Sequence, residues 1–342
     1  MKTKAERKQE IMKAVSSCDR EKYYKHEVLS EMLKLESEIV ETVFSEDHHE
    51  TAHLKLRDVE RHLDQLNEAS GGIANAELEQ FLADSKKVSN LIRAEISGNC
   101  GEDKAFKSLS RITGNYKLLK NVELSDGQTR TELDGTVITP KGVFIIEVKN
   151  TRKDIFIAED GKYYRTGKYL RLDSNLGEKM ELRRQLLTKV LRDAGIKNIA
   201  VNNLIVFTND TVEITNECKT LKTTFLCQLP HMINDYDGPL MYSDSEVTQI
   251  AEIIESARSP EMYPLGFDAW KFKQDFVSVI LKLEYASSTR VELETVEQEL
   301  LRTPRNAKVK NDKWDKAIWT AVGAACALCG VSTAKLLVKA FG

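Results

Sequence analysis

The chain has 342 residues, a formal net charge of −3 and 41% apolar residues. One hydrophobic core rarely serves more than about 250–300 residues, so we expect two or three structural units. The even spread of apolar residues excludes a disordered chain, and the near-neutral charge excludes a histone-like polycation. Six scattered cysteines do not form a disulfide scaffold, and the charged N-terminus lacks the apolar core of a secretory signal. We therefore expect a cytoplasmic protein.

The first segment, residues 1–97, has helical periodicity. Leu56, Val59, Leu63 and Leu66 follow at intervals of three, four and three residues, which is the spacing of a coiled-coil seam. We expect a helical hairpin or coiled-coil arm. The arm would either pack on the following domain or serve in oligomerisation.

The pattern changes to α/β after residue 97. A helix is predicted over 102–120, and a basic helix is predicted at about 178–194. Strands are predicted at 132–138, 143–149, 155–157, 201–207 and 222–228. This order predicts an α/β fold, a mixed sheet flanked by helices, over 98–230. The remaining segments are expected to be a helical extension (231–303), a basic linker (304–316) and an apolar C-terminal helix (317–342).

Two of these β runs are joined at 139–142, where the positions of Pro and Gly predict a type I turn and hence a hairpin. With these four residues as the loop, Asp134 lies opposite Glu147, and Lys149 shares their face. Facing like charges destabilise a sheet, so a shared proton, a nearby cation or a bound metal must offset them. Two converging carboxylates and a lysine predict a hard-cation site, the alternative being a solvated, salt-bridged strand face. The opposite face is expected to be apolar: Leu133, Val137, Phe144, Ile146 and Val148.

The sequence around this hairpin, Glu132-Leu-Asp134 and Gly142 to Asn150, together with Gly101-Glu102, closely resembles the NERD (nuclease-related domain) family of the PD-(D/E)xK nuclease superfamily. The resemblance covers about 98–215. It implies that Asp134 and Glu147 bind Mg²⁺ or Mn²⁺, and that Glu102 opens a helix and points at the metal. It also implies that Lys149 positions or deprotonates the attacking water, and that Gln185 matches the family's helical glutamine. Leu133 replaces the family's Pro, and the Asn-Pro that often precedes the glutamine is missing.

The resemblance implies a metal-dependent DNA endonuclease, and by analogy a role in bacterial defence against foreign DNA. The segment 162–193 is locally basic and interleaved with tyrosines, which suits DNA binding, although a solvated helix face is the alternative. The predicted DNA-binding residues are Lys162, Arg165, Lys168, Arg171, Arg183 and Arg184. Two other hypotheses are a catalytically silent nucleic-acid-binding scaffold and a membrane-associated oligomeric effector.

The C-terminal segment 317–334 carries no charged residue. Gly323, Ala327 and Gly330 give it the small-residue spacing that lets helices approach closely. Its many Ala, Gly, Ser and Thr residues make it borderline as a membrane span. We expect a homo-oligomer assembled through this helix, with membrane contact through 317–342 as the alternative.

Overall fold

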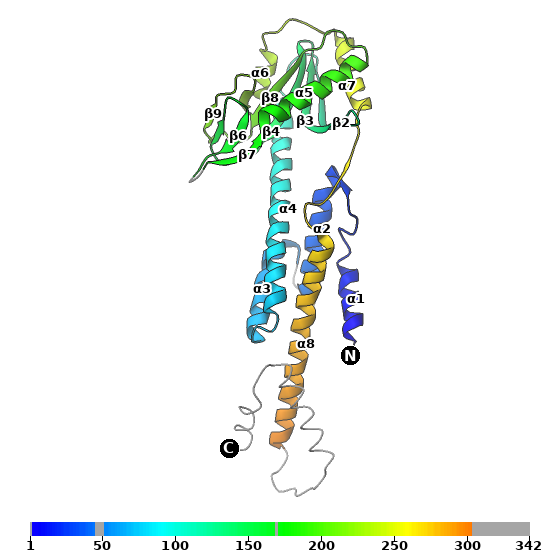
Figure 1. Cartoon of the computed structure of the whole chain (residues 1–342), viewed down its shortest axis with the longest axis vertical. Helices are drawn as coiled ribbons and strands as arrows, with labels where there is room; N and C mark the ends of the chain where they lie inside the picture. Colours follow the sequence, from blue (N-terminus) through cyan, green and yellow to red (C-terminus); the bar gives the residue numbers. More distant parts are fainter. Residues whose placement is uncertain (1, 45–50, 168–169, 303–342) are drawn as a thin grey trace. The chain divides into compact units, whose positions relative to one another are not determined.

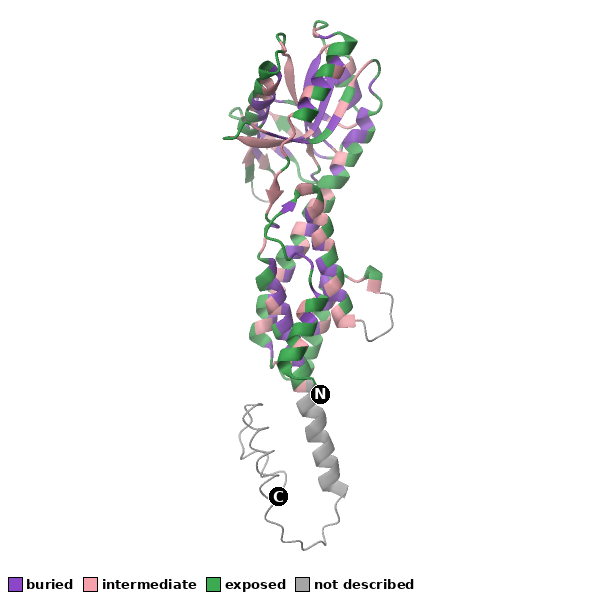
Figure 2. Cartoon of the chain, turned by 90° about the vertical axis from the view of Figure 1, so that its right-hand side faces the viewer, coloured by how far each residue is buried: buried purple, intermediate pink, exposed green. Residues whose placement is uncertain are grey.

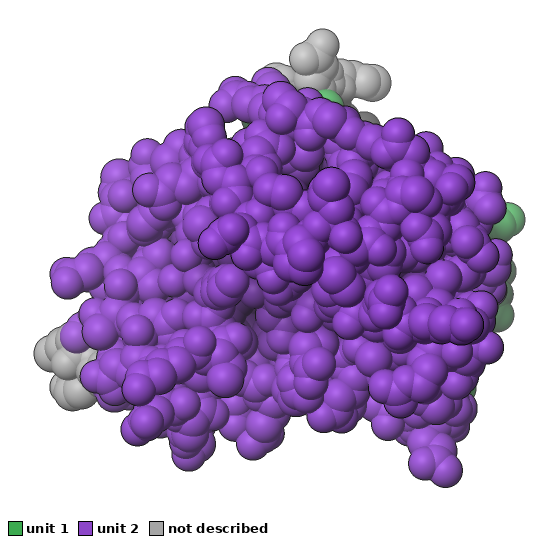
Figure 3. All heavy atoms as spheres, turned by 90° about the horizontal axis from the view of Figure 1, so that it is seen from above, with its two compact units in different colours: residues 1–21, 30–90, 265–342 green, residues 22–29, 91–264 purple. Residues whose placement is uncertain are grey.

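The computed structural model describes residues 2–44, 51–167 and 170–302, with side chains up to residue 286 (Figure 1). Residues 22–29 and 91–264 form one compact unit, and residues 1–21, 30–90 and those from 265 onward form the other. The first is an α/β unit, one face of which is drawn in purple in Figure 3, and the second is helical. The units are divided at 21/22, 29/30, 90/91 and 264/265, whereas the sequence suggested boundaries at 97/98 and 230/231.

The helical unit is built from amphipathic helices. Its core includes Phe81, whose ring stacks on that of Phe272 with centroids 5.5 Å apart. The predicted apolar stripe is present at Leu63, but Leu66 is 40% exposed and Asn67 is buried in its place. The helices of this unit are α1 (Lys4–Ala14), α2 (Lys25–Phe44), α3 (Leu56–Ala69), α4 (Asn75–Leu109) and α8 (Ala269–Arg302), with residues 25–29 of α2 and 91–109 of α4 counted in the α/β unit.

The α/β unit contains a five-stranded mixed sheet in the order β10-β8-β4-β3-β2, which confirms the predicted fold class. β2, β3 and β4 are antiparallel neighbours, whereas β4, β8 and β10 run parallel. The parallel β4–β8 pair is joined through α5, as a crossover requires. The elements are β2 (Lys117–Ser125), β3 (Arg130–Thr139), β4 (Gly142–Lys149), α5 (Leu176–Asp193), β8 (Val201–Phe207) and β10 (Lys222–Phe225).

Smaller elements complete this unit. A four-stranded sheet has the order β7-β6-β5-β9, and a two-stranded ladder pairs β1 with β11. The elements are β1 (Tyr23–Tyr24), β5 (Ile155–Ile157), β6 (Lys162–Arg165), β7 (Arg171–Asn175), β9 (Ile214–Asn216), α6 (Leu229–Asn234), α7 (Asp244–Ser256) and β11 (Met262–Tyr263).

Both faces of the five-stranded sheet are covered by helices. One hydrophobic cluster joins the sheet to α5 and α7, and a second joins it to the end of α4 and to α6. The central strand β4 is therefore buried on both faces from Gly142 to Glu147, and Figure 2 shows buried strands in the α/β unit. Burial on both faces explains why the run Val143-Phe-Ile-Ile146 is continuously apolar rather than alternating.

The helix predicted over 102–120 is not a separate element. α4 runs without interruption to Leu109, and β2 begins at Lys117. Gly98 and Gly101 do not end the helix, because tertiary contacts along α4 outweigh the low helix propensity of glycine. Glu102 therefore lies within the last turns of a 35-residue helix and not at a helix N-terminus.

The predicted alternation of side chains fails at one position of β3. The β2–β3 ladder skips one pair, Asn121 opposite Asp134, and Asn121 has a left-handed φ of +48°. The alternation between the two faces of the sheet is broken there. Leu133 consequently packs with Ile138 on the α5 side, and not with Val137 as predicted.

Candidate functional site

The site lies where β3 and β4 separate. The hairpin has the predicted register, but its ladder ends at the pair Gly135–Ile146, one step before Asp134 and Glu147. Asp134 Oδ2 instead accepts a hydrogen bond of 2.8 Å from the backbone N–H of Val148. The two strands therefore open around the two carboxylates, which leaves space for a third group between them.

Arg183 of α5 is that third group. Its Nη1 donates to Glu147 Oε2, and its Nη2 lies 3.5 Å from Asp134 Oδ1. Glu147 is 1% exposed and Arg183 is 2% exposed. The structure thus brings the two predicted carboxylates together, with one buried guanidinium bridging them.

Two lysines approach the same carboxylate from the solvent side. Lys149 Nζ is 2.6 Å from Glu147 Oε1, and Lys179 Nζ is 3.4 Å from the same oxygen. The side chain of Lys149 is 22% exposed and that of Lys179 is 45% exposed. The site is therefore closed by Arg183 on the interior side and reaches solvent along the lysines.

The two carboxylates have opposite electrostatic environments. Burial and the negative charge of Glu147 raise the pKa of Asp134 well above its ordinary value. Burial alone would raise the pKa of Glu147 too, but the charges of Arg183 and Lys149 outweigh it and hold that pKa below its usual range. Burial also lowers the pKa of Lys179. The sequence left a shared proton, a nearby cation or a bound metal as ways to offset the two facing carboxylates. The structure shows nearby cations, Arg183 and Lys149.

Glu102 belongs to a neighbouring charged group. The Asn121 side chain and Lys25 favour its charged form, and Lys25 forms an ion pair with Glu132. Burial raises the pKa of Glu102, Lys25 opposes this effect and Glu132 adds to it. The negative charge of Glu147 makes a smaller contribution in the same direction as Glu132.

Gln185 does not lie at the site. Its side chain is exposed and donates a hydrogen bond of 2.7 Å to Glu181. It follows Arg183 by two residues, which turns it about 200° around the helix axis and away from the carboxylates. The structure thus does not bring Gln185 to the carboxylates, and its catalytic role stays a prediction from the resemblance.

The sequence reasoning missed that Lys179 and Arg183 belong to the carboxylate site. They are four residues apart, so they lie on one face of α5. That face also carries the buried residues Leu176, Met180 and Leu187, which marks it as the side that packs on the sheet. The helical periodicity of these apolar residues could have indicated that Lys179 and Arg183 face the sheet.

The predicted DNA-binding residues are mostly paired with acids. The ion pairs are Lys162–Asp160 at 2.6 Å, Arg165–Asp173 at 3.0 Å and Arg184–Glu181 at 2.6 Å. Arg183 is buried and therefore not part of an exposed basic surface. Arg171 is exposed on β7, and Lys168 lies outside the described residues. The net charge of the segment thus overstates how much unpaired positive charge the described surface offers.

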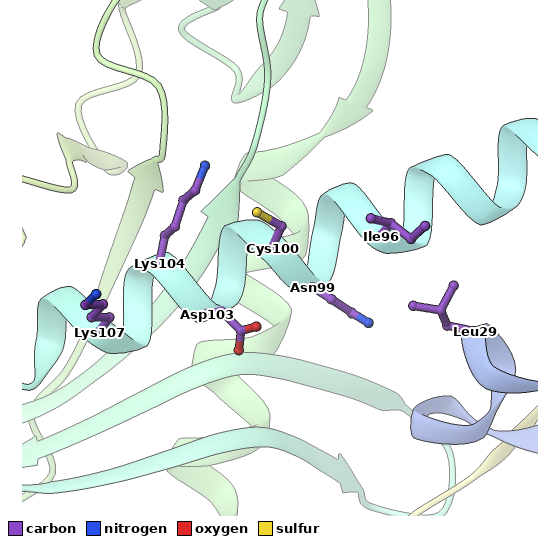
Figure 4. A pocket seen from close by; sticks show the side chains of 7 residues that line it. All are labelled: Leu29, Ile96, Asn99, Cys100, Asp103, Lys104 and Lys107. Atoms are coloured by element: carbon purple, nitrogen blue, oxygen red, sulfur yellow. The ribbon is translucent and has the colours of Figure 1, made fainter. Parts of the chain in front are cut away.

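A pocket lies along the last part of α4 (Figure 4). Lys104 extends from one side of the helix and Asp103 from the other, so the polar groups of this pocket do not converge on one point. The pocket lining consists of Leu29, Ile96, Asn99, Cys100, Asp103, Lys104 and Lys107.

The α/β unit thus combines a mixed sheet with flanking helices, and two carboxylates and a lysine lie where two of its strands separate. Residues 97–208 match the family model NERD, nuclease-related domain, which belongs to the PD-(D/E)xK-like nuclease group. The resemblance seen in the sequence is thereby confirmed for this third of the chain. Comparison with curated proteins and with solved structures gave no match.

Two further findings concern the described residues alone. Within them, no group of three or more His, Cys, Asp or Glu side chains is arranged to hold a metal ion. No helix of this part of the chain combines the length and apolar character needed to cross a membrane. The segment 317–342, on which the expected assembly and membrane contact rest, lies outside the described residues.

Proposed function

We propose that the α/β unit hydrolyses phosphodiester bonds of DNA as a metal-dependent endonuclease. The observation that supports this is the contact of Asp134 and Glu147 with a single guanidinium. Two carboxylates that reach one cation can in principle reach another at the same place. The match of residues 97–208 to the nuclease-related domain supports phosphodiester hydrolysis as the class of reaction.

Asp134 and Glu147 are the residues that would hold Mg²⁺ or Mn²⁺, because carboxylate oxygens are the ligands these hard cations prefer. A bound divalent cation would lower the pKa of a water molecule and neutralise charge on the phosphate. Glu102 is a weaker candidate as a third ligand, because it lies with Lys25 and Glu132 in the neighbouring charged group.

Lys149 and Lys179 suit the handling of the substrate phosphate. Both ammonium groups lie at Glu147 Oε1 and both side chains are partly exposed. Each can donate hydrogen bonds to water or to a phosphate oxygen that enters from solvent. We assign to Lys149 the positioning of the attacking water. Lys149 and Glu147 lie two residues apart on the same strand, β4, which fixes the position of one side chain relative to the other.

DNA is proposed as the substrate, and defence against foreign DNA as the biological role, by analogy with nucleases of this type. Arg171 would make phosphate contacts, together with the ion-paired Lys162, Arg165 and Arg184. Lys168, which lies outside the described residues, stays a predicted contact of the same kind. Because most of these cations already have acidic partners, we expect a modest dependence of DNA affinity on salt.

A second candidate function is a catalytically silent nucleic-acid-binding scaffold. One observation favours it: three cationic side chains, Arg183, Lys149 and Lys179, already compensate the two carboxylates. A membrane-associated oligomeric effector is the third hypothesis, and it depends on residues 317–342 alone.

A panel of divalent metals with supercoiled and linear DNA distinguishes these functions. We expect cleavage by the wild-type chain with Mg²⁺ or Mn²⁺, and none by Asp134→Ala. Lys149→Met should bind metal within a few-fold of wild type but lose turnover. DNA binding without cleavage under every metal condition would identify the scaffold, and cleavage by Asp134→Ala equal to wild type would rule out the proposed site.

A further inference from the structure

The position of Arg183 bears on how the site is switched on. We propose that Arg183 and the divalent cation compete for the same two carboxylates, so that the guanidinium keeps the site closed until a nucleic-acid phosphate draws it away. This inference rests on the proposed metal-dependent function and adds a mode of regulation to it.

Every carboxylate oxygen of the pair already has a donor. Arg183 contacts Glu147 Oε2 and Asp134 Oδ1, and the backbone N–H of Val148 donates to Asp134 Oδ2. Glu147 Oε1 is taken by Lys149 and Lys179. A divalent cation that binds both carboxylates therefore enters a site whose oxygens already accept from these donors, and it shares that site with their positive charges.

Of these donors, Arg183 is the one that a bound divalent cation would displace, because of its positive charge and its burial. A divalent cation between the carboxylates would stand in contact with the guanidinium, and two like charges at such a distance repel strongly where water is scarce. A guanidinium does not lose its proton in proteins, so it must move. The two lysines can turn toward water because they are partly exposed, whereas Arg183 is 2% exposed and needs an anionic partner when it leaves.

A phosphate group is the partner that fits. A guanidinium can donate two parallel hydrogen bonds to the oxygens of one phosphate. It therefore fits a phosphate group better than an ammonium does. Arg183 Nε is held by Thr131 Oγ1 at 3.3 Å, so the base of the side chain stays anchored while its outer nitrogens exchange partners. Metal and DNA should then bind with positive coupling, because each favours the state in which Arg183 has left the carboxylates.

The test measures Mn²⁺ binding to the full chain by isothermal titration calorimetry, which does not depend on cleavage. Arg183→Met is compared with wild type and with Arg192→Met, a matched control on an exposed position of the same helix. We expect Arg183→Met to bind Mn²⁺ about tenfold more tightly than wild type, and Arg192→Met to bind like wild type. A short DNA duplex should raise the Mn²⁺ affinity of wild type and leave that of Arg183→Met nearly unchanged.

Equal or weaker Mn²⁺ binding by Arg183→Met, with its unfolding transition intact, would overturn the inference while leaving the proposed function in place. If Arg183→Met does not fold, Arg183→Lys replaces it, since a lysine keeps the charge but cannot bridge both carboxylates. Its expected gain in affinity is smaller, and an affinity equal to wild type counts against the inference. Absence of Mn²⁺ binding in all variants, with and without DNA, would overturn the proposed function together with the inference.

Discussion

Asp134 and Glu147 are both carboxylates of one site, yet they differ in what they contribute to stability. Glu147 is buried and contacts three cations, whereas Asp134 contacts Arg183 at 3.5 Å and is repelled by Glu147. A buried ion pair that loses one partner leaves an uncompensated charge in a medium of low dielectric constant. The two residues should therefore respond differently to neutralisation.

Glu147→Gln should reduce the free energy of unfolding by about 3–5 kcal/mol, because it leaves the buried Arg183 with Asp134, at 3.5 Å, as its one carboxylate partner among the described residues. Asp134→Asn should cost about 1 kcal/mol or less, because it also removes a repulsion. Urea denaturation of both variants at pH 7 measures the difference. Equal losses would show that the guanidinium does not depend on Glu147 more than on Asp134.

Asp134 should also make stability depend on pH. Its carboxyl pKa is raised by burial and by Glu147 to about 7, so the folded chain binds this proton more tightly than the unfolded chain. Folding is then favoured at low pH by this group, and its contribution is lost as the pH rises from about 4 to about 7. Comparison of urea midpoints across this range should show a flatter pH profile for Asp134→Asn, and parallel profiles would contradict the assignment.

At the scale of elements, the contact between α4 and the end of β4 holds the site strand in place. A Cβ atom on Gly101 would lie 2.8 Å from Asn150 Cβ. Asn150 Nδ2 donates to Ser97 O at 2.7 Å, and Asn150 Oδ1 accepts from Thr208 Oγ1. Asn150 therefore ties the helix to the ends of two strands. Gly101, part of the sequence signature, is therefore explained by a close approach and not by a helix start.

Gly101→Ala should destabilise the chain by about 1–3 kcal/mol, because the contact is with a Cβ atom next to the backbone, which cannot move aside cheaply. Gly98→Ala on the same helix is the control: a Cβ atom added at Gly98 would meet nothing within 4 Å, and alanine favours helix by about 0.5–1 kcal/mol. Thermal or urea unfolding of both variants measures the opposite signs. Stabilisation by both changes would show that helix propensity, and not the contact, determines the outcome.

At the scale of the whole molecule, the chain has two compact units, and the segments of each are not contiguous in sequence. Residues 25–29 and 91–109 belong to the α/β unit although their helices, α2 and α4, also supply residues to the helical unit. Where the boundary passes through a helix, as at 29/30 in α2 and at 90/91 in α4, no linker composition marks it in the sequence. Assembly remains a prediction that depends on the segment beyond residue 302.

Deletion of 317–342 should convert an oligomer into a smaller species that still binds metal, because the spacing of Gly323, Ala327 and Gly330 favours close helix pairing. Sedimentation velocity of the full chain and of the truncated chain decides this. Equal masses would remove the C-terminal segment as an assembly element. Fractionation of cells tests the membrane alternative, and recovery of the full chain outside the membrane fraction would exclude it.

The sequence by itself determined the register of the hairpin and the meeting of Asp134, Glu147 and Lys149. These features follow from the turn at 139–142 and from the alternation of side chains along a strand, and both are properties of a few neighbouring residues. The nuclease-related signature lies in the same local stretch, which is why the resemblance is visible without the fold.

Only the tertiary structure decided which groups surround those carboxylates. Whether Arg183 or Gln185 reaches the site depends on which face of α5 packs against the sheet, and that face is chosen by burial of apolar residues far apart in sequence. The break in alternation at Asn121 and the passage of α4 through Gly101 likewise depend on contacts with other elements. The local sequence pattern thus determined the positions of Asp134 and Glu147, and long-range packing of α5 placed Arg183 between them.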